Sequence, residues 1–177
     1  MITRYTRTAR TLHWLLAILL LEQLVFGWWL GDVPRNTPDR GYFINLHKSI
    51  GMLIGLVILL RLGWRLSHPA PTLPDFLPDW KKRLSLVSHY GMYLCMLIMP
   101  LSGYVASNFS KHGVKFLNTM VFPPWGNDDK LVYAVLNQTH KITAVVLALL
   151  IGVHILAALQ HGLRRDGIIH RMWIRPF

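Results

Sequence analysis

Residues 139–161 read THKITAVVLALLIGVHILAALQH, an apolar stretch with His140 at its start and His154 two helical turns before its end. A helix needs about 20 mostly apolar residues to cross the roughly 30 Å hydrocarbon core of a bilayer. Three other stretches of the chain approach this length. The four predicted spanning helices cover about residues 12–30, 44–64, 86–107 and 139–161. We therefore expect an all-α fold, a four-helix transmembrane bundle.

The composition of the chain excludes other classes of protein. Hydrophobic residues make up 53% and charged residues 15% of the 177 residues, whereas soluble proteins have about 45–50% and about 25%. A chain this apolar could not stay solvated as a disordered protein. The net charge is +11. The basic residues lie mainly between the apolar stretches, which indicates that they contact lipid headgroups and that the chain has no nucleic-acid partner. The length predicts a single domain over residues 1–177.

The distribution of Lys and Arg predicts the orientation of the bundle. Twelve of the 19 lie near the two termini and in the connection between the second and third spans. The other seven lie on the opposite side: Arg35, Arg40, Lys48, Lys111, Lys115, Lys130 and Lys141. Because cytoplasmic segments carry an excess of Lys and Arg, we expect a multi-pass protein with both termini in the cytoplasm.

Four of the nine histidines are predicted to lie at matching depths. His140 and His154 are 14 residues apart, so their side chains share one helix face and lie about 21 Å apart along it. His13 begins the first span on the cytoplasmic side, at the depth of His154. His47 begins the second span on the outer side, at the depth of His140. The sequence therefore predicts two cross-bundle pairs, His13 with His154 and His47 with His140.

Each predicted pair could supply both axial ligands of a haem iron held between helices. Cys95 is the only cysteine, so no CxxCH attachment motif exists and both haems would be non-covalent haems b. Two irons about 20 Å apart would provide an electron path across the bilayer. Zinc is the competing metal, but neither an HExxH motif nor a thiolate cluster favours it. If the histidines are only interfacial side chains, the chain is a non-redox bundle or a transporter.

Four cationic side chains near these histidines are candidate partners for haem propionates. Arg61 and Arg65 lie four residues apart at the inner end of the second span, and their guanidinium forks suit carboxylates. Lys48 and Lys141 each directly follow one of the two outer histidines. For all four, the alternative is anchoring at the membrane interface, with the side-chain stems lying along lipid.

Several short motifs, taken in this order, resemble the bacterial cytochrome b561 family, small four-helix di-haem b proteins of the inner membrane. The motifs are Arg10-Thr-Leu-His13-Trp14, Asn45-Leu-His47-Lys-Ser-Ile-Gly51, Arg61-Leu-Gly-Trp-Arg65-Leu, His89-Tyr-Gly-Met-Tyr93, Pro100-Leu-Ser-Gly103 and the tail Arg164-Arg165-Asp166-Gly-Ile-Ile-His-Arg171-Met172. The resemblance covers nearly the whole chain. Carried over by position, the axial ligands of the family would be His13, His47, His140 and His154.

This resemblance implies a location in the bacterial inner membrane and electron exchange with ubiquinone. It further implies oxidation of superoxide at the periplasmic face, with the electron passed inward to the quinone. A similar helical core occurs in haem b subunits that anchor hydrogenases and dehydrogenases, which is the alternative function. Bases outnumber acids in the outer connections, which would attract superoxide electrostatically, although they could equally be ordinary solvated loop residues.

The roles of three ionisable side chains stay open. Glu22 is the only acid within a predicted span. It could deliver protons to a quinone, or it could be a protonated carboxyl hydrogen-bonded inside the bundle with Gln23 turned elsewhere. His89 and His161 lie toward the cytoplasmic side and are candidates for a quinone site or for supporting the ligands.

Overall fold

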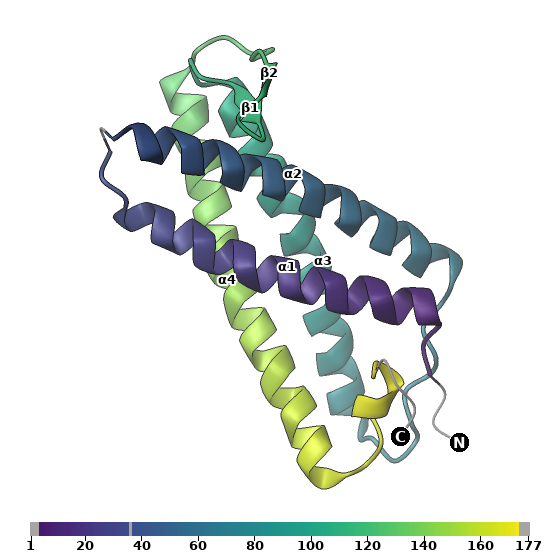
Figure 1. Cartoon of the computed structure of the whole chain (residues 1–177). Coiled ribbons are helices and arrows are strands. Elements are labelled where there is room, and N and C mark those ends of the chain that lie inside the picture. Colours follow the sequence, from purple (N-terminus) through teal and green to yellow (C-terminus); the bar gives the residue numbers. More distant parts are fainter. Residues whose placement is uncertain (1–3, 36, 174–177) are drawn as a thin grey trace.

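Four long helices account for most of the residues that the computed structural model describes, 4–35 and 37–173. They are α1 (Arg7–Asp32), α2 (Pro38–Ser67), α3 (Asp79–Asn108) and α4 (Lys130–Arg164). Each is long and apolar enough to cross a membrane. The helices α1 and α2 form one antiparallel pair, which crosses the antiparallel pair of α3 and α4 (Figure 1). The prediction of an all-α four-helix transmembrane bundle is confirmed.

Each helix is longer than the apolar stretch that predicted it. The largest extension is at the start of α4, which begins at Lys130 rather than near residue 139. There Asp129 accepts hydrogen bonds from the backbone N–H groups of Leu131 and Val132, which satisfies donors that have no partner within the helix. With 35 residues, α4 is about 52 Å long and extends beyond the hydrocarbon core.

The two ends of the bundle differ in what covers them. Both described termini and the α2–α3 connection lie at one end, here called the terminal end (Figure 1). The α1–α2 turn and a short antiparallel hairpin of β1 (Val114–Phe116) and β2 (Met120–Phe122) lie at the other, the hairpin end. The sequence did not predict these strands. The hairpin is held on α2, where Ser49 accepts a hydrogen bond of 2.8 Å from the Leu117 N–H.

An apolar core separates the two ends. It lies between the helix pairs and contains Leu16, Leu20, Leu24, Ile54, Ile58, Cys95, Met96, Met99 and Leu147. The outward faces of the helices are also apolar but exposed, as expected of surfaces that contact lipid tails.

The C-terminal tail closes the terminal end of the bundle. Its short helix η1 (Ile169–Arg171) ends at Arg171, which is only 4% exposed. The Arg171 guanidinium donates to the carbonyls of Pro71 at 2.6 Å and Thr72 at 3.0 Å. It also lies over the ring of Tyr5. One buried cation therefore joins the tail, the α2–α3 connection and the segment before α1.

We expect Arg171→Gln to lower the free energy of unfolding by about 1.5–3 kcal/mol, because the hydrogen bonds from a buried charged donor to the Pro71 and Thr72 carbonyls are lost. Thermal unfolding in detergent measures the change, with proteolytic cleavage of the α2–α3 connection as the readout. Arg164→Gln removes an exposed cation at the end of α4 and should leave stability unchanged. Equal stability of the Arg171 variant and the parent protein would contradict this role.

Candidate functional site: two histidine pairs

The first histidine pair lies at the terminal end. The ring centroids of His13, on α1, and His154, on α4, are 6.1 Å apart, with an interplanar angle of 75°. A third ring, that of His89 on α3, lies on His154 at a centroid distance of 5.5 Å. The structure therefore brings the predicted partners together and places beside them His89, which the sequence offered as a candidate for supporting the ligands or for a quinone site.

The second pair lies at the hairpin end. The ring centroids of His47, on α2, and His140, on α4, are 6.2 Å apart, with an interplanar angle of 84°. Because α4 contributes one histidine to each pair, the two pairs lie on opposite sides of the apolar core. This arrangement is the one that helical periodicity and antiparallel topology predict.

Both centroid distances suit one metal ion bound between two imidazoles. With metal–nitrogen bonds of about 2.0 Å on each side, the ring centroids lie about 6 Å apart. Among the described residues, no group of three or more His, Cys, Asp or Glu could hold a metal ion. Zinc sites use at least three protein ligands, whereas a haem iron needs only the two axial ones. The donor sets therefore fit a haem better than zinc.

His140 is held in the orientation that metal binding needs. Its Nδ1–H donates to the carbonyl of Met99 on α3 at 2.7 Å, which leaves the Nε2 lone pair available to a metal. A Cβ at Gly103 would lie 2.9 Å from Nδ1 of His140, and a Cβ at Gly27 would lie 3.0 Å from Cε1 of His47. Both imidazoles of this pair therefore occupy space that only glycine provides.

Two buried polar atoms near His47 lack a partner. Gln23 is 5% exposed and its Nε2 donates to the His47 carbonyl at 2.7 Å. Within the part of the chain that the structure describes, Gln23 Oε1 and His47 Nδ1 are buried without a hydrogen bond. Buried polar groups are normally paired, so an unpaired cluster calls for an explanation. A site completed by a bound group supplies one.

The sequence left open that Glu22 lies inside the bundle and Gln23 is turned elsewhere, and the structure shows the opposite. The Gln23 amide points into the bundle, and Glu22 is exposed on the outside of α1. Of the two alternatives left open for Glu22, the one with a carboxyl hydrogen-bonded inside the bundle is therefore wrong. Successive helical residues differ by about 100° in direction, so only the packing of α1 distinguishes the two.

The four candidate cations have different surroundings. Arg61 lies at the terminal-end pair, with Nη2 3.2 Å from His13 Nδ1. Arg65 lies over the Tyr5 ring instead. Lys48 donates to the Gly113 carbonyl at 2.9 Å, which secures the base of the hairpin, and Lys141 is exposed. Of the four, only Arg61 contacts a paired histidine.

Two further histidines at the terminal end have fixed hydrogen bonds. His89 Nδ1–H donates to the Ser85 carbonyl at 2.5 Å, and His161 Nδ1–H donates to Asp166 Oδ2 at 2.6 Å. Burial alone would raise the pKa of Asp166, but the hydrogen bonds from His161 and from the Ile168 N–H, with nearby positive charge, hold that pKa below its usual value. The Asp166 carboxylate is therefore held in its ionised form beside His161.

Comparison with known proteins identifies the family. The family model described as prokaryotic cytochrome b561 matches residues 4–174. The chain belongs to the prokaryotic cytochrome b561 family. This cytochrome b561 is thus a multi-pass membrane protein and a b-type cytochrome, and the family is one of electron-transfer oxidoreductases.

Curated relatives resemble this cytochrome b561 over nearly their whole length. Cytochrome b561 homolog 2 of Escherichia coli strain K12 is 27% identical over 173 residues, which cover 96% of this chain and 90% of the relative. Cytochrome b562 of Cereibacter sphaeroides is 27% identical, with 97% and 96% covered. A protein of Yersinia pestis named probable superoxide oxidase CybB is 24% identical, with 91% and 90% covered.

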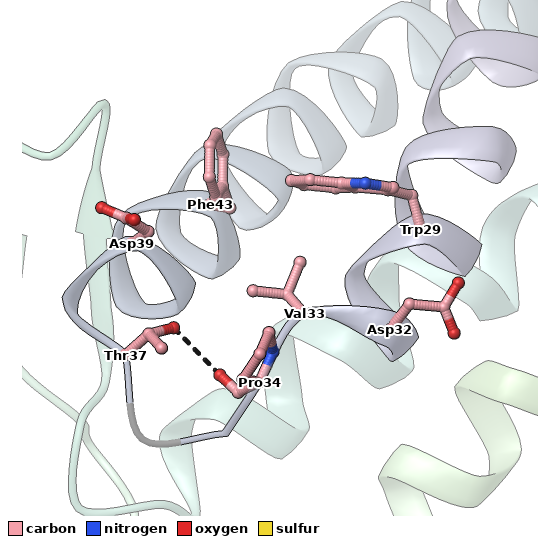
Figure 2. Close-up of a pocket in the computed structure, with 7 residues that line it drawn as sticks. All are labelled: Trp29, Asp32, Val33, Pro34, Thr37, Asp39 and Phe43. Carbon is pink, nitrogen blue, oxygen red and sulfur yellow. Dashed lines mark hydrogen bonds between the residues drawn. The ribbon is translucent and has the colours of Figure 1, made fainter.

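A shallow hollow lies at the hairpin end of this cytochrome b561, between the end of α1 and the start of α2 (Figure 2). Trp29 and Phe43 both line it and meet edge to face, with their ring centroids 4.9 Å apart. Phe26 contacts both rings and lies 5.7 Å from the ring of His47. The acidic side chain of Asp32 also lines the hollow, so the hollow does not suit an anion.

Proposed function

We propose that this cytochrome b561 holds two haems b, one at each histidine pair, and carries single electrons across the bacterial inner membrane. The donor would act at the hairpin end, and ubiquinone would be reduced. The observation that carries the proposal is the presence of two imidazole pairs with nearly equal spacing on opposite sides of the apolar core. When bound, haem iron supplies reversible one-electron oxidation and reduction.

In this proposal His13 and His154 would hold one haem, and His47 and His140 would hold the other. The Met99 carbonyl fixes the tautomer of His140 and makes Nε2 the donor to iron. Arg61 has a different task. A guanidinium only donates hydrogen bonds, so the His13 Nδ1 that Arg61 contacts carries no proton. If His13 bound iron through Nε2 as a neutral imidazole, its proton would be on Nδ1, and Nδ1 could no longer accept from Arg61. With haem bound, Arg61 would need another acceptor, and a haem propionate would provide one.

The distribution of Lys and Arg supports placing the hairpin end in the periplasm and both termini in the cytoplasm. Reduction of ubiquinone to ubiquinol consumes protons as well as electrons. His89 and the His161–Asp166 pair lie at the terminal end, and we assign them to hold or deliver those protons. His89 suits the role because its Nδ1 is occupied by Ser85, which leaves Nε2 as an acceptor.

Superoxide is the donor that we propose, and the basic surface of the hairpin end supports it. Arg40 is engaged with the Leu30 and Val33 carbonyls, and Lys111 lies 3.8 Å from Asp128. Lys48 is bonded to the Gly113 carbonyl. Four further cations of this end are exposed: Arg35, Lys115, Lys130 and Lys141. A positive surface raises the encounter rate of an anion with the protein.

The decisive experiment supplies superoxide as the sole electron donor to the purified protein in nanodiscs with ubiquinone. We expect a reduced-minus-oxidised spectrum typical of haem b, two haems per chain, and ubiquinol formation. Copurification with an iron–sulfur subunit, together with inactivity of the chain alone, would instead establish the anchor function. A colourless preparation would contradict both.

Salt should slow the reaction with superoxide. Raising the ionic strength from about 10 mM to about 200 mM shortens the Debye length from roughly 30 Å to under 10 Å, and we expect the second-order rate to fall about tenfold. Stopped-flow absorbance measures that rate, with an uncharged reductant as the control. A rate that does not respond to salt would remove superoxide attraction from the proposal.

A further inference from the structure

The outward face of α1 carries an ionisable group where lipid tails are expected. Glu22 is exposed and lies near the middle of the apolar part of α1, about 15 Å from the helix end at Asp32. Within the described residues it makes no hydrogen bond or ion pair. Hydrocarbon offers no partner to a carboxyl group, and such groups are rare on lipid-facing surfaces.

Glu22 lies within a regular stripe on that face. The α1 seam, as we call it, consists of Leu15, Ile18, Glu22, Val25 and Trp29, all of them exposed. Its spacing alternates between three and four residues, which is the pattern of the a and d positions of a coiled coil. Glu22 occupies an a position at the centre of the seam.

The outward face of α4 lacks this feature. It presents Ile142, Val145, Leu149, Val153 and Leu156. Lipid tails can solvate such a face completely. The α1 seam differs because its central group needs a polar partner.

We propose that two copies of this chain form a symmetric dimer through the α1 seam, with the two Glu22 carboxyls hydrogen-bonded to each other. Two copies inserted with the same topology have parallel α1 helices, and in a parallel two-helix seam each a position meets the same residue of the other helix. A neutral carboxyl has one donor and one acceptor, so two of them satisfy one another. A single polar a residue also specifies register and pairing.

Cysteine cross-linking in native membranes tests the dimer. In a Cys95→Ser background, Ile18→Cys and Val25→Cys place a thiol on either side of Glu22. Leu149→Cys, on α4 and equally exposed to lipid, is the matched control. We expect oxidation to give disulfide-linked dimers at positions 18 and 25 and only background at 149. Haem content measured on the same samples shows that each variant is folded.

Two substitutions at the centre of the seam identify the interaction. Glu22→Leu should reduce the cross-linked fraction at dilute protein-to-lipid ratios and weaken dimerisation about tenfold. Glu22→Gln keeps a hydrogen-bond donor and an acceptor and should leave the cross-linked fraction unchanged. Cross-linking to a different protein, equal cross-linking at position 149, or an unchanged dimer in Glu22→Leu would each overturn the proposal. None of these results depends on electron transfer or on its donor.

Discussion

We expect His140→Ala to reduce the haem content from two haems per chain to one, and His154→Ala to do the same at the opposite end of the bundle. Each substitution would remove one of the two imidazoles proposed to hold that haem, and the single remaining imidazole would hold it less tightly. Haem extraction as the pyridine complex, divided by protein concentration, gives the stoichiometry. The reduced spectra should then lose a different component in each variant.

Two control variants make the result specific. His112→Ala removes an exposed loop histidine and should retain both haems. His89→Ala tests the ring that lies closest to His154; we expect two haems, because His13 has the spacing that suits a shared iron. Two haems in either His140→Ala or His154→Ala would show that the proposed pairing is wrong.

A change that leaves every histidine in place should have nearly as large an effect. We expect Gly103→Ala to weaken haem binding at the hairpin end by about 10–100-fold, the range seen when hydrogen-bonded support of a metal ligand is lost. The new methyl group would lie 2.9 Å from His140 Nδ1, so the imidazole must move and lose its hydrogen bond to Met99. Haem stoichiometry and the potentiometric titration of the remaining haem measure the effect.

Gly152→Ala is the matched control for this substitution. It also adds one methyl group to a glycine within a spanning helix, but nothing lies within 4 Å of the added atom. We expect full haem content in this variant. Full haem content and unchanged potentials in Gly103→Ala would contradict the view that His140 depends on the space beside this glycine.

The histidine pairs were accessible from the sequence because depth in a membrane follows from position along a helix. Each residue adds about 1.5 Å of rise, and antiparallel topology then fixes which helix ends share a level. The pairs His13 with His154 and His47 with His140 follow from these two rules. The supporting groups do not, because the Met99 carbonyl is a backbone atom with no residue type to reveal it.

Lys48 shows a second limit of reasoning from neighbours in sequence. Its position directly after His47 suggested a partner for a haem propionate, but its ammonium group is bonded to Gly113 of the hairpin. Adjacent helical residues point in different directions, so proximity in the chain does not imply a shared environment. The hairpin itself was missed because three-residue strands carry too short a pattern to recognise.

The number of helices and the depth of the histidines depend on the order of apolar and polar residues along each segment, and the sequence alone was sufficient to predict them. The direction that each side chain faces depends on how the helices pack laterally. Packing alone established that Gln23 lies inside and Glu22 outside, that Arg61 rather than Lys48 reaches a paired histidine, and that Gly103 makes room for His140. Rotation of a helix about its axis changes these contacts while leaving depth unchanged, which is why the sequence could not specify them.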